Sequence, residues 1–136
     1  MKKTLSIVFV LAIMAVVSVN SFASDMMMPR WSNIFVMVNE ITFDGTSGNA
    51  SGSVVGQAGT SYITGTLTVY EENGSGGWTY VDSVSGENES GKEFMALSVE
   101  FTGESGKNYK SILSVTVYDS VGKGESEEKP ATKKCP

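Results

Sequence analysis

Apolar residues recur at every second position along most of the chain. The clearest example is Tyr62–Glu71, where Ile63, Gly65, Leu67 and Val69 fall on one side and tyrosines and threonines on the other. This period of two is typical of a β-strand with one buried and one solvent-facing side. Threonine and tyrosine suit the exposed face. We therefore expect a strand here, and no segment after residue 23 has a convincing helical period.

Further strand-like segments are separated by short runs of Gly, Asn and Ser that predict turns. They are Trp31–Phe43, Asn49–Val55, Trp78–Ser85, Lys92–Thr102, Tyr109–Asp119 and Glu125–Glu128. The first is either two short strands or one strand with a bulge, because both of its faces are apolar before Asn39. About seven short strands joined by turns predict an all-β, immunoglobulin-like antiparallel β-sandwich. A small barrel is the alternative.

Alternation also predicts side-chain placement within Trp78–Ser85. Trp78, Tyr80 and Val84 fall on one face of this strand and Val81 on the other.

Two local features refine the predicted sandwich. Tyr109 begins a late strand directly after a glycine-containing turn, which is where a tyrosine corner would lie. In Asn49–Val55, the face that carries Ala50, Gly52 and Val54 is small, so a neighbouring strand or sheet can approach closely.

The first 23 residues resemble a targeting signal rather than part of the fold. Two lysines precede an apolar run that is shorter than the roughly 20 residues needed to span a bilayer. Ser21 and Ala23 are small residues that fit a signal-peptidase site, so we expect cleavage between Ala23 and Ser24 and a secreted product without membrane insertion. The predicted regions are a signal peptide (1–23), a flexible leader (24–30), a β-sandwich domain (31–128) and a disordered tail (129–136).

Charge and cysteine content limit the partners. The chain has 10 basic and 15 acidic residues, and loss of two lysines with the signal leaves 8 against 15, a net charge of −7. Such a surface repels nucleic acid and anionic membranes. Cys135 is the only cysteine. It could link two chains through a disulfide, although we favour a tail thiol without a role.

No catalytic constellation is present, and we expect neither an enzyme nor a cofactor. The chain has no histidine and no Gly-x-Ser-x-Gly motif, which excludes Ser-His-Asp and Cys-His hydrolases. Gly86–Glu93 has phosphate-loop spacing, but it lacks the Ser or Thr after its lysine and precedes a predicted strand. A carboxylate pair for glycoside hydrolysis stays formally open, without diagnostic spacing.

Two loops contain oxygen atoms of the kind that calcium prefers, but neither matches a known calcium spacing. We interpret these residues as solvated turn residues rather than as a metal site. They are Asp44, Thr46 and Asn49 in one loop and Glu71, Glu72 and Asn73 in the other.

Trp31, Trp78 and Tyr80 are the aromatic residues that we expect nearest the surface. An exposed aromatic platform could stack on sugar rings or anchor a protein partner. The alternative is that Trp78 closes the core at a sheet edge, which we favour for this residue.

Several short motifs resemble those of small secreted proteins of unknown function from Gram-positive, clostridia-like bacteria. They are the Met-Lys-Lys start, Trp31–Ile34, Gly76–Trp78, Gly106–Lys110, Val117–Gly122 and Glu125-Ser126. The resemblance implies an immunoglobulin-like sandwich and export, but no activity and no site residues. We therefore expect a secreted, non-enzymatic module that binds an extracellular protein. A carbohydrate-binding module that uses the surface aromatics is the alternative.

Overall fold

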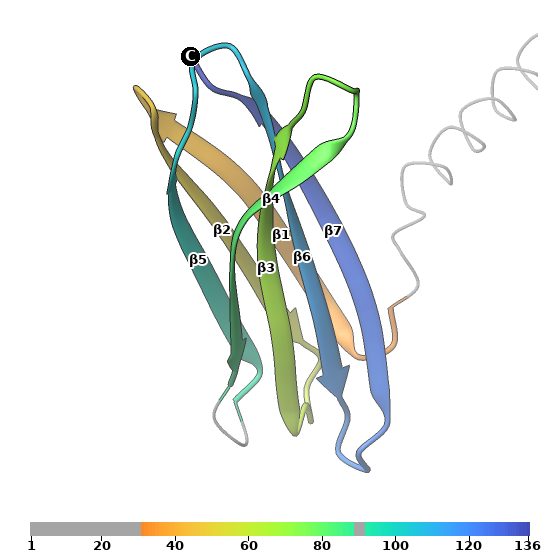
Figure 1. Cartoon of the computed structure of the whole chain (residues 1–136). Helices are drawn as coiled ribbons and strands as arrows, with labels where there is room; N and C mark the ends of the chain where they lie inside the picture. The colour runs from red at the N-terminus through yellow and green to blue at the C-terminus, as the bar shows by residue number, and fades with distance from the viewer. Residues whose placement is uncertain (1–30, 89–91) are drawn as a thin grey trace, which may run out of the picture. The chain divides into compact units, whose positions relative to one another are not determined.

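The computed structural model describes residues 31–88 and 92–136, and all regular elements in this part of the chain are β-strands. They are β1 (Ile34–Asp44), β2 (Ser47–Gly56), β3 (Tyr62–Glu72), β4 (Trp78–Glu87), β5 (Phe94–Thr102), β6 (Asn108–Tyr118) and β7 (Gly124–Lys134). One antiparallel sheet has the order β1-β2-β5 and the other β4-β3-β6-β7 (Figure 1). The fold is an immunoglobulin-like antiparallel β-sandwich, so the predicted fold class is confirmed.

The expected signal peptide, its cleavage site between Ala23 and Ser24, and the leader 24–30 lie outside the described residues and stay predictions. Within residues 31–88 and 92–136, no helix has the length and hydropathy needed to cross a membrane.

The core lies between the two sheets and takes every second residue of the central strands. The alternation is unbroken along β6, where Tyr109, Leu113 and Val117 are buried and Ser114 and Tyr118 face outward. The buried apolar residues are Ile34, Met37, Ile41, Ala50, Val54, Ile63, Leu67, Val69, Met95, Val99, Phe101, Tyr109, Leu113, Val115, Val117 and Cys135. The apolar face predicted for Tyr62–Glu71 and the small face predicted for Asn49–Val55 are in the interior or partly buried against it, so the period of two identified these faces correctly.

Small residues on β2 permit close packing, as the sequence predicted. A Cβ atom at Gly52 would come within 2.9 Å of the Leu113 side chain in the opposite sheet. A Cβ atom at Gly48 would lie 2.5 Å from the ring of Phe101 on the adjacent strand β5. Both contacts are shorter than van der Waals distance, so a side chain at either position would displace its neighbour.

Bulges change the side-chain alternation in both edge strands β1 and β4. The register of β1 against β2 shifts between Ile34 and Val36, so β1 is one bulged strand rather than two short ones. The register of β4 against β3 shifts at Val81, which has no partner of its own. A bulge adds one residue and reverses which side chains face the core beyond it.

The C-terminal end of the chain is ordered, and the prediction of a disordered tail over 129–136 is wrong. The edge strand β7 pairs with β6 along its whole length, from Gly124 to Lys134. Cys135 follows it and is buried, with a relative exposure of 1%. The backbone of Cys135 bonds to the β5–β6 loop, beside which the chain ends (Figure 1).

Tyr109 forms the tyrosine corner that its position predicted. Its hydroxyl accepts a hydrogen bond from the backbone N–H of Glu104, five residues earlier, at 2.7 Å. The same hydroxyl donates to the carboxylate of Glu71 at 2.6 Å. The corner therefore ties the β5–β6 connection to the end of β3.

Candidate binding surfaces

Trp31, Trp78 and Tyr80 do not form a single platform. Trp31 packs against the core, whereas Trp78 and Tyr80 lie on the outer face of β4 with relative exposures of 37% and 59%. The interpretation of Trp78 as a core residue is therefore wrong. The bulge at Val81 explains this placement. Val81 and Val84 both pack against the core, and the extra residue shifts the alternation so that Tyr80 and Trp78 face outward.

Trp78 and Tyr80 belong to an aromatic platform that also includes Tyr70 of β3 and Lys110 of β6. Tyr80 is paired directly with Tyr70, and Tyr70 is paired with Lys110. The Lys110 ammonium lies 4.6 Å from the Trp78 ring centre and 5.7 Å from that of Tyr70. These are cation–π distances, so the lysine connects and orients the two rings.

A groove lined by hydroxyl groups runs beyond this platform on the same outer face. It is lined by Thr64, Gly65, Thr66, Ser85, Gly86, Glu87, Ser114, Val115 and Thr116. Gly65 and Gly86 are cross-strand partners, and a side chain at either position would point toward the core. The neighbours of these two glycines along each strand face outward, and their polar side chains border the groove. We call this feature the hydroxyl groove.

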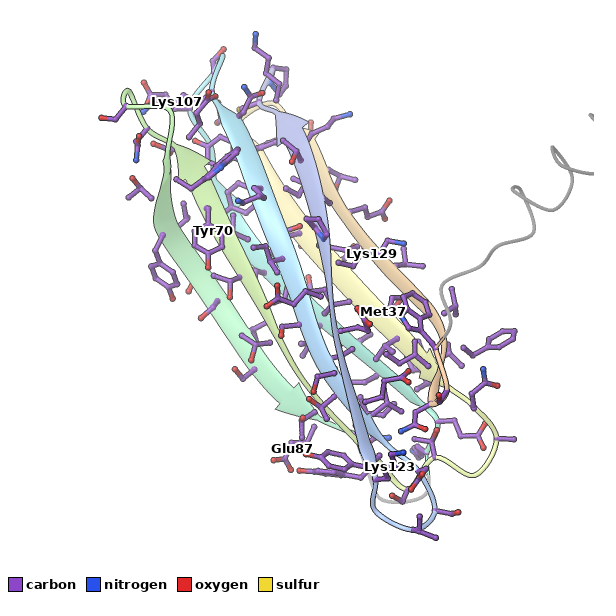
Figure 2. All side chains as sticks on the ribbon, turned by 90° about the vertical axis from the view of Figure 1, so that its right-hand side faces the viewer. Met37, Tyr70, Glu87, Lys107, Lys123 and Lys129 are labelled. Carbon is purple, nitrogen blue, oxygen red and sulfur yellow. The ribbon has the colours of Figure 1, made fainter. Side chains whose placement is uncertain are left out.

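A pair of tyrosines lies beside the far end of the hydroxyl groove. Tyr62 and Tyr118 are cross-strand partners with ring centres 5.5 Å apart. A hydrogen bond to Glu87 raises the pKa of the Tyr62 phenol, with smaller contributions from desolvation and from the charge of Glu87. Figure 2 shows Glu87 near one end of the sandwich and Tyr70 nearer the other. Aromatic side chains thus lie beyond both ends of the groove.

The outer face of the other sheet has an apolar patch. Val36 of β1, Val55 of β2 and Phe94 of β5 form one cross-strand row, and Val38 and Ala96 belong to the next row. Relative exposures are 38% for Val36, 48% for Val38 and 55% for Phe94. We call these five residues the valine–phenylalanine patch. Phe35, which is 64% exposed, lies at the bulge beside it.

One candidate calcium loop is occupied by internal hydrogen bonds. Glu71 accepts from Tyr109 and pairs with Lys107 at 3.0 Å, and Glu72 accepts from the Asn108 amide at 2.7 Å. The hydrogen bond from Tyr109 and then the contact with Lys107 hold the pKa of Glu71 below its ordinary value. These carboxylates stabilise the loops at the end of the sandwich where Figure 2 shows Lys107.

Among residues 31–88 and 92–136, no three side chains of His, Cys, Asp or Glu gather closely enough to hold a metal ion. The thiol of Cys135 lies against Gly45, with its sulfur 3.9 Å from the carbonyl oxygen, and the residue is buried. Cys135 therefore belongs to the core and not to a disordered tail. A disulfide to a second chain would require Cys135 to leave the core.

No protein-family model and no curated protein sequence matches this chain. Among solved structures, it is similar to PapD-like domain 7 of human CEP192, with 14% identity, a TM-score of 0.50, and coverage of 82% of this chain and 90% of that one. Another similar structure is the sensor domain of the anti-sigma factor RsgI4 from Pseudobacteroides cellulosolvens, with 16% identity, a TM-score of 0.43, and coverage of 76% and 94%. The CEP192 likeness shows the fold alone. The fold implied by the resemblance is confirmed, and the relation to clostridial secreted proteins stays a prediction.

Sequence reasoning missed Tyr70, Lys110 and Phe94 as surface-site residues. Tyr70 continues the outward series of Tyr62–Glu71, so the alternation contained a signal for its exposure. For the valine–phenylalanine patch, the signal was that both faces of the first strand are apolar before Asn39. Nothing local to Lys110 indicated its contact with Trp78, because that contact depends on the pairing of β6, β3 and β4.

Proposed function

We propose that this chain is an exported, non-enzymatic module that binds a protein partner through the valine–phenylalanine patch. One observation supports this above all: three neighbouring strands each contribute an apolar side chain to the same outward-facing row, in which Val36 and Phe94 are exposed and Val55 is half-buried. The solvent-facing side of an antiparallel sheet is normally polar. A contiguous exposed apolar area is typical of a protein-interaction surface.

The surroundings of the patch also suit a protein partner. Val38 and Ala96 also line a hollow, together with Glu40 and mainly small residues of β2 and β5. An apolar centre with a polar border is the usual organisation of a protein interface. Since the mature chain is expected to be acidic, a partner with a basic border around an apolar centre has the complementary charge.

Site-specific photo-crosslinking tests this proposal. We would place a photo-reactive amino acid at Phe94, and at Tyr118 on the opposite sheet as the matched control, and illuminate the protein on the cells that export it. The expected result is one protein cross-linked from position 94 and not from position 118. That protein is then purified and titrated against the wild-type domain and Phe94→Glu.

The titration decides the role of the patch. A buried charge at an apolar hot spot should weaken the Kd by about a hundredfold or more. Equal affinity of wild type and Phe94→Glu would refute the proposal, as would cross-linking from both positions alike. Recovery of the uncleaved precursor from the cytosol would refute export. If sedimentation shows that the domain alone self-associates and that Phe94→Glu abolishes this, the partner is a second copy of the chain.

A further inference from the structure

The outer face of the β4-β3-β6-β7 sheet has a regular order that the protein-binding proposal does not use. Cross-strand pairing aligns its outward residues in rows. From one end, the row of Trp78 and the row of Tyr80, Tyr70 and Lys110 are followed by three rows in which β4, β3 and β6 contribute mainly Ser and Thr, and then by the row of Tyr62 and Tyr118. Aromatic rows therefore lie on both sides of a central area rich in Ser and Thr.

We infer that this face binds a neutral oligosaccharide, with Trp78 and Tyr80 stacking on sugar rings and the hydroxyl groove hydrogen-bonding to sugar hydroxyls. This inference does not depend on the proposed protein partner, because the two surfaces lie on different sheets.

The aromatic platform is already positioned for stacking. Lys110 lies against both Trp78 and Tyr70, and the Tyr80 hydroxyl is 3.1 Å from the hydroxyl of Ser83. Sugar rings present apolar C–H faces, and a flat aromatic surface fits them at low entropic cost when it is fixed in advance. Trp78 and Tyr80 remain exposed in spite of these contacts.

The hydroxyl groove suits a neutral, polyhydroxylated ligand. Each Ser or Thr hydroxyl donates one hydrogen bond and accepts two. The pair Thr66–Ser85, at 2.9 Å, uses only part of this capacity. Among the described residues that line the groove, Glu87 is the one charged side chain, and it interacts with Tyr62. A strongly anionic ligand would meet this carboxylate and an acidic chain.

The face is long enough for several sugar rings. Tyr70 and Tyr62 are eight residues apart on β3, which corresponds to about 27 Å along an antiparallel strand. A ligand on this line would reach the aromatic platform, the hydroxyl groove and the Tyr62–Tyr118 pair. An oligosaccharide therefore gains more from this surface than a single sugar.

Fluorescence and calorimetry test the inference with defined probes. The chain has two tryptophans, so the variant Trp31→Phe leaves Trp78 as the only tryptophan reporter. Cellohexaose, xylohexaose, mannohexaose, chitohexaose and maltohexaose are each titrated up to millimolar concentration. We expect at least one to shift the Trp78 emission. Calorimetry on the unmodified domain should give the same Kd.

Matched variants locate the binding site. Trp78→Ala and Tyr80→Ala should each weaken the calorimetric Kd by about tenfold, since each removes one stacking surface. Phe94→Ser, on the opposite sheet, should leave the Kd unchanged while it impairs protein binding. All variants are first checked for the far-ultraviolet spectrum of the wild type.

Three results would overturn the inference. They are no binding of any of the five hexasaccharides, binding that both aromatic variants leave unchanged, and tighter binding of a sulfated oligosaccharide than of every neutral one. None of these results bears on Phe94, so failure here stays distinct from failure of the protein-binding proposal.

Discussion

Replacement of Tyr109 by Phe removes one hydroxyl from the tyrosine corner and leaves the ring in place. The hydroxyl has two partners, the backbone N–H of Glu104 and the carboxylate of Glu71. The ring itself packs against Phe43 and Phe101, with centres 5.6 and 5.2 Å away. Because Phe keeps these ring contacts, the variant isolates the contribution of the two hydrogen bonds.

The expected cost follows from the burial of each partner. A polar group left without its hydrogen bond costs about 1–3 kcal/mol, with the higher values for charged groups. The Glu71 side chain is 28% exposed, so water can replace part of the hydrogen bonding that the Tyr109 hydroxyl provided. We therefore expect Tyr109→Phe to lower the free energy of unfolding by about 2 kcal/mol. In a domain of this size that corresponds to a fall in Tm of roughly 10 °C.

The effect of this variant depends on pH in a defined direction. The hydrogen bond from Tyr109 is the largest cause of the lowered pKa of Glu71, followed by Lys107. A carboxyl group with a lowered pKa in the folded state adds stability above its unfolded pKa, and this stability is lost as the pH falls through the folded pKa. The difference in the free energy of unfolding between wild type and Tyr109→Phe should therefore be largest at neutral pH and shrink below about pH 4.

Urea denaturation followed by fluorescence measures both effects, at neutral pH and at a series of acidic values. Tyr118→Phe is the matched control, because Tyr118 lies on the same strand but faces outward. The control should change the free energy of unfolding by at most about 0.5 kcal/mol. A loss for Tyr109→Phe no larger than for Tyr118→Phe would contradict the role of the corner. A difference that stays constant down to the lowest pH would contradict the role of Glu71.

Three other changes test the packing. Gly48→Ala should lower the free energy of unfolding by about 1–3 kcal/mol, because the added methyl group meets the ring of Phe101. Gly74→Ala is the matched control: Gly74 lies in open space at a negative φ, so this change should be close to neutral in the same denaturation assay. The Cys135 thiol is buried, so it should react with a thiol reagent only as fast as the native protein unfolds. Fast labelling without denaturant would contradict its burial. Ending the chain at Glu128 should prevent folding, because half of the β7 pairing is lost; a dispersed amide spectrum of the shortened protein would contradict this.

The strands were predictable because alternation is a local property of the sequence. In Tyr62–Glu71 and in the strand that follows Lys92, side chains of one kind recur at every second position, and burial in the structure follows them. The tyrosine corner was predictable for a similar reason, since Tyr109 follows a glycine turn. Its carboxylate acceptor was not, because Glu71 lies 38 residues away in sequence.

The C-terminal segment illustrates where composition fails. Lys129–Lys134 is polar and includes Pro130, which gave the prediction of disorder. The open edge of β6 nevertheless offers backbone partners along its whole length, and proline is tolerated on an edge strand. Backbone hydrogen bonding is therefore what orders this segment, and it brings Cys135 into the core.

The sequence by itself determined the all-β class, the positions of the first six strands and the faces of the central strands, because an extended chain separates its two faces at a period of two. Only the tertiary structure decided which surface residues come together. Trp78 and Lys110 meet because β4, β3 and β6 pair in one register, and the bulge at Val81 turns Trp78 outward. Asn39, which interrupts an apolar run in the sequence, bonds to Ser111 of the opposite sheet. Such pairings depend on long-range register, which no local pattern specifies.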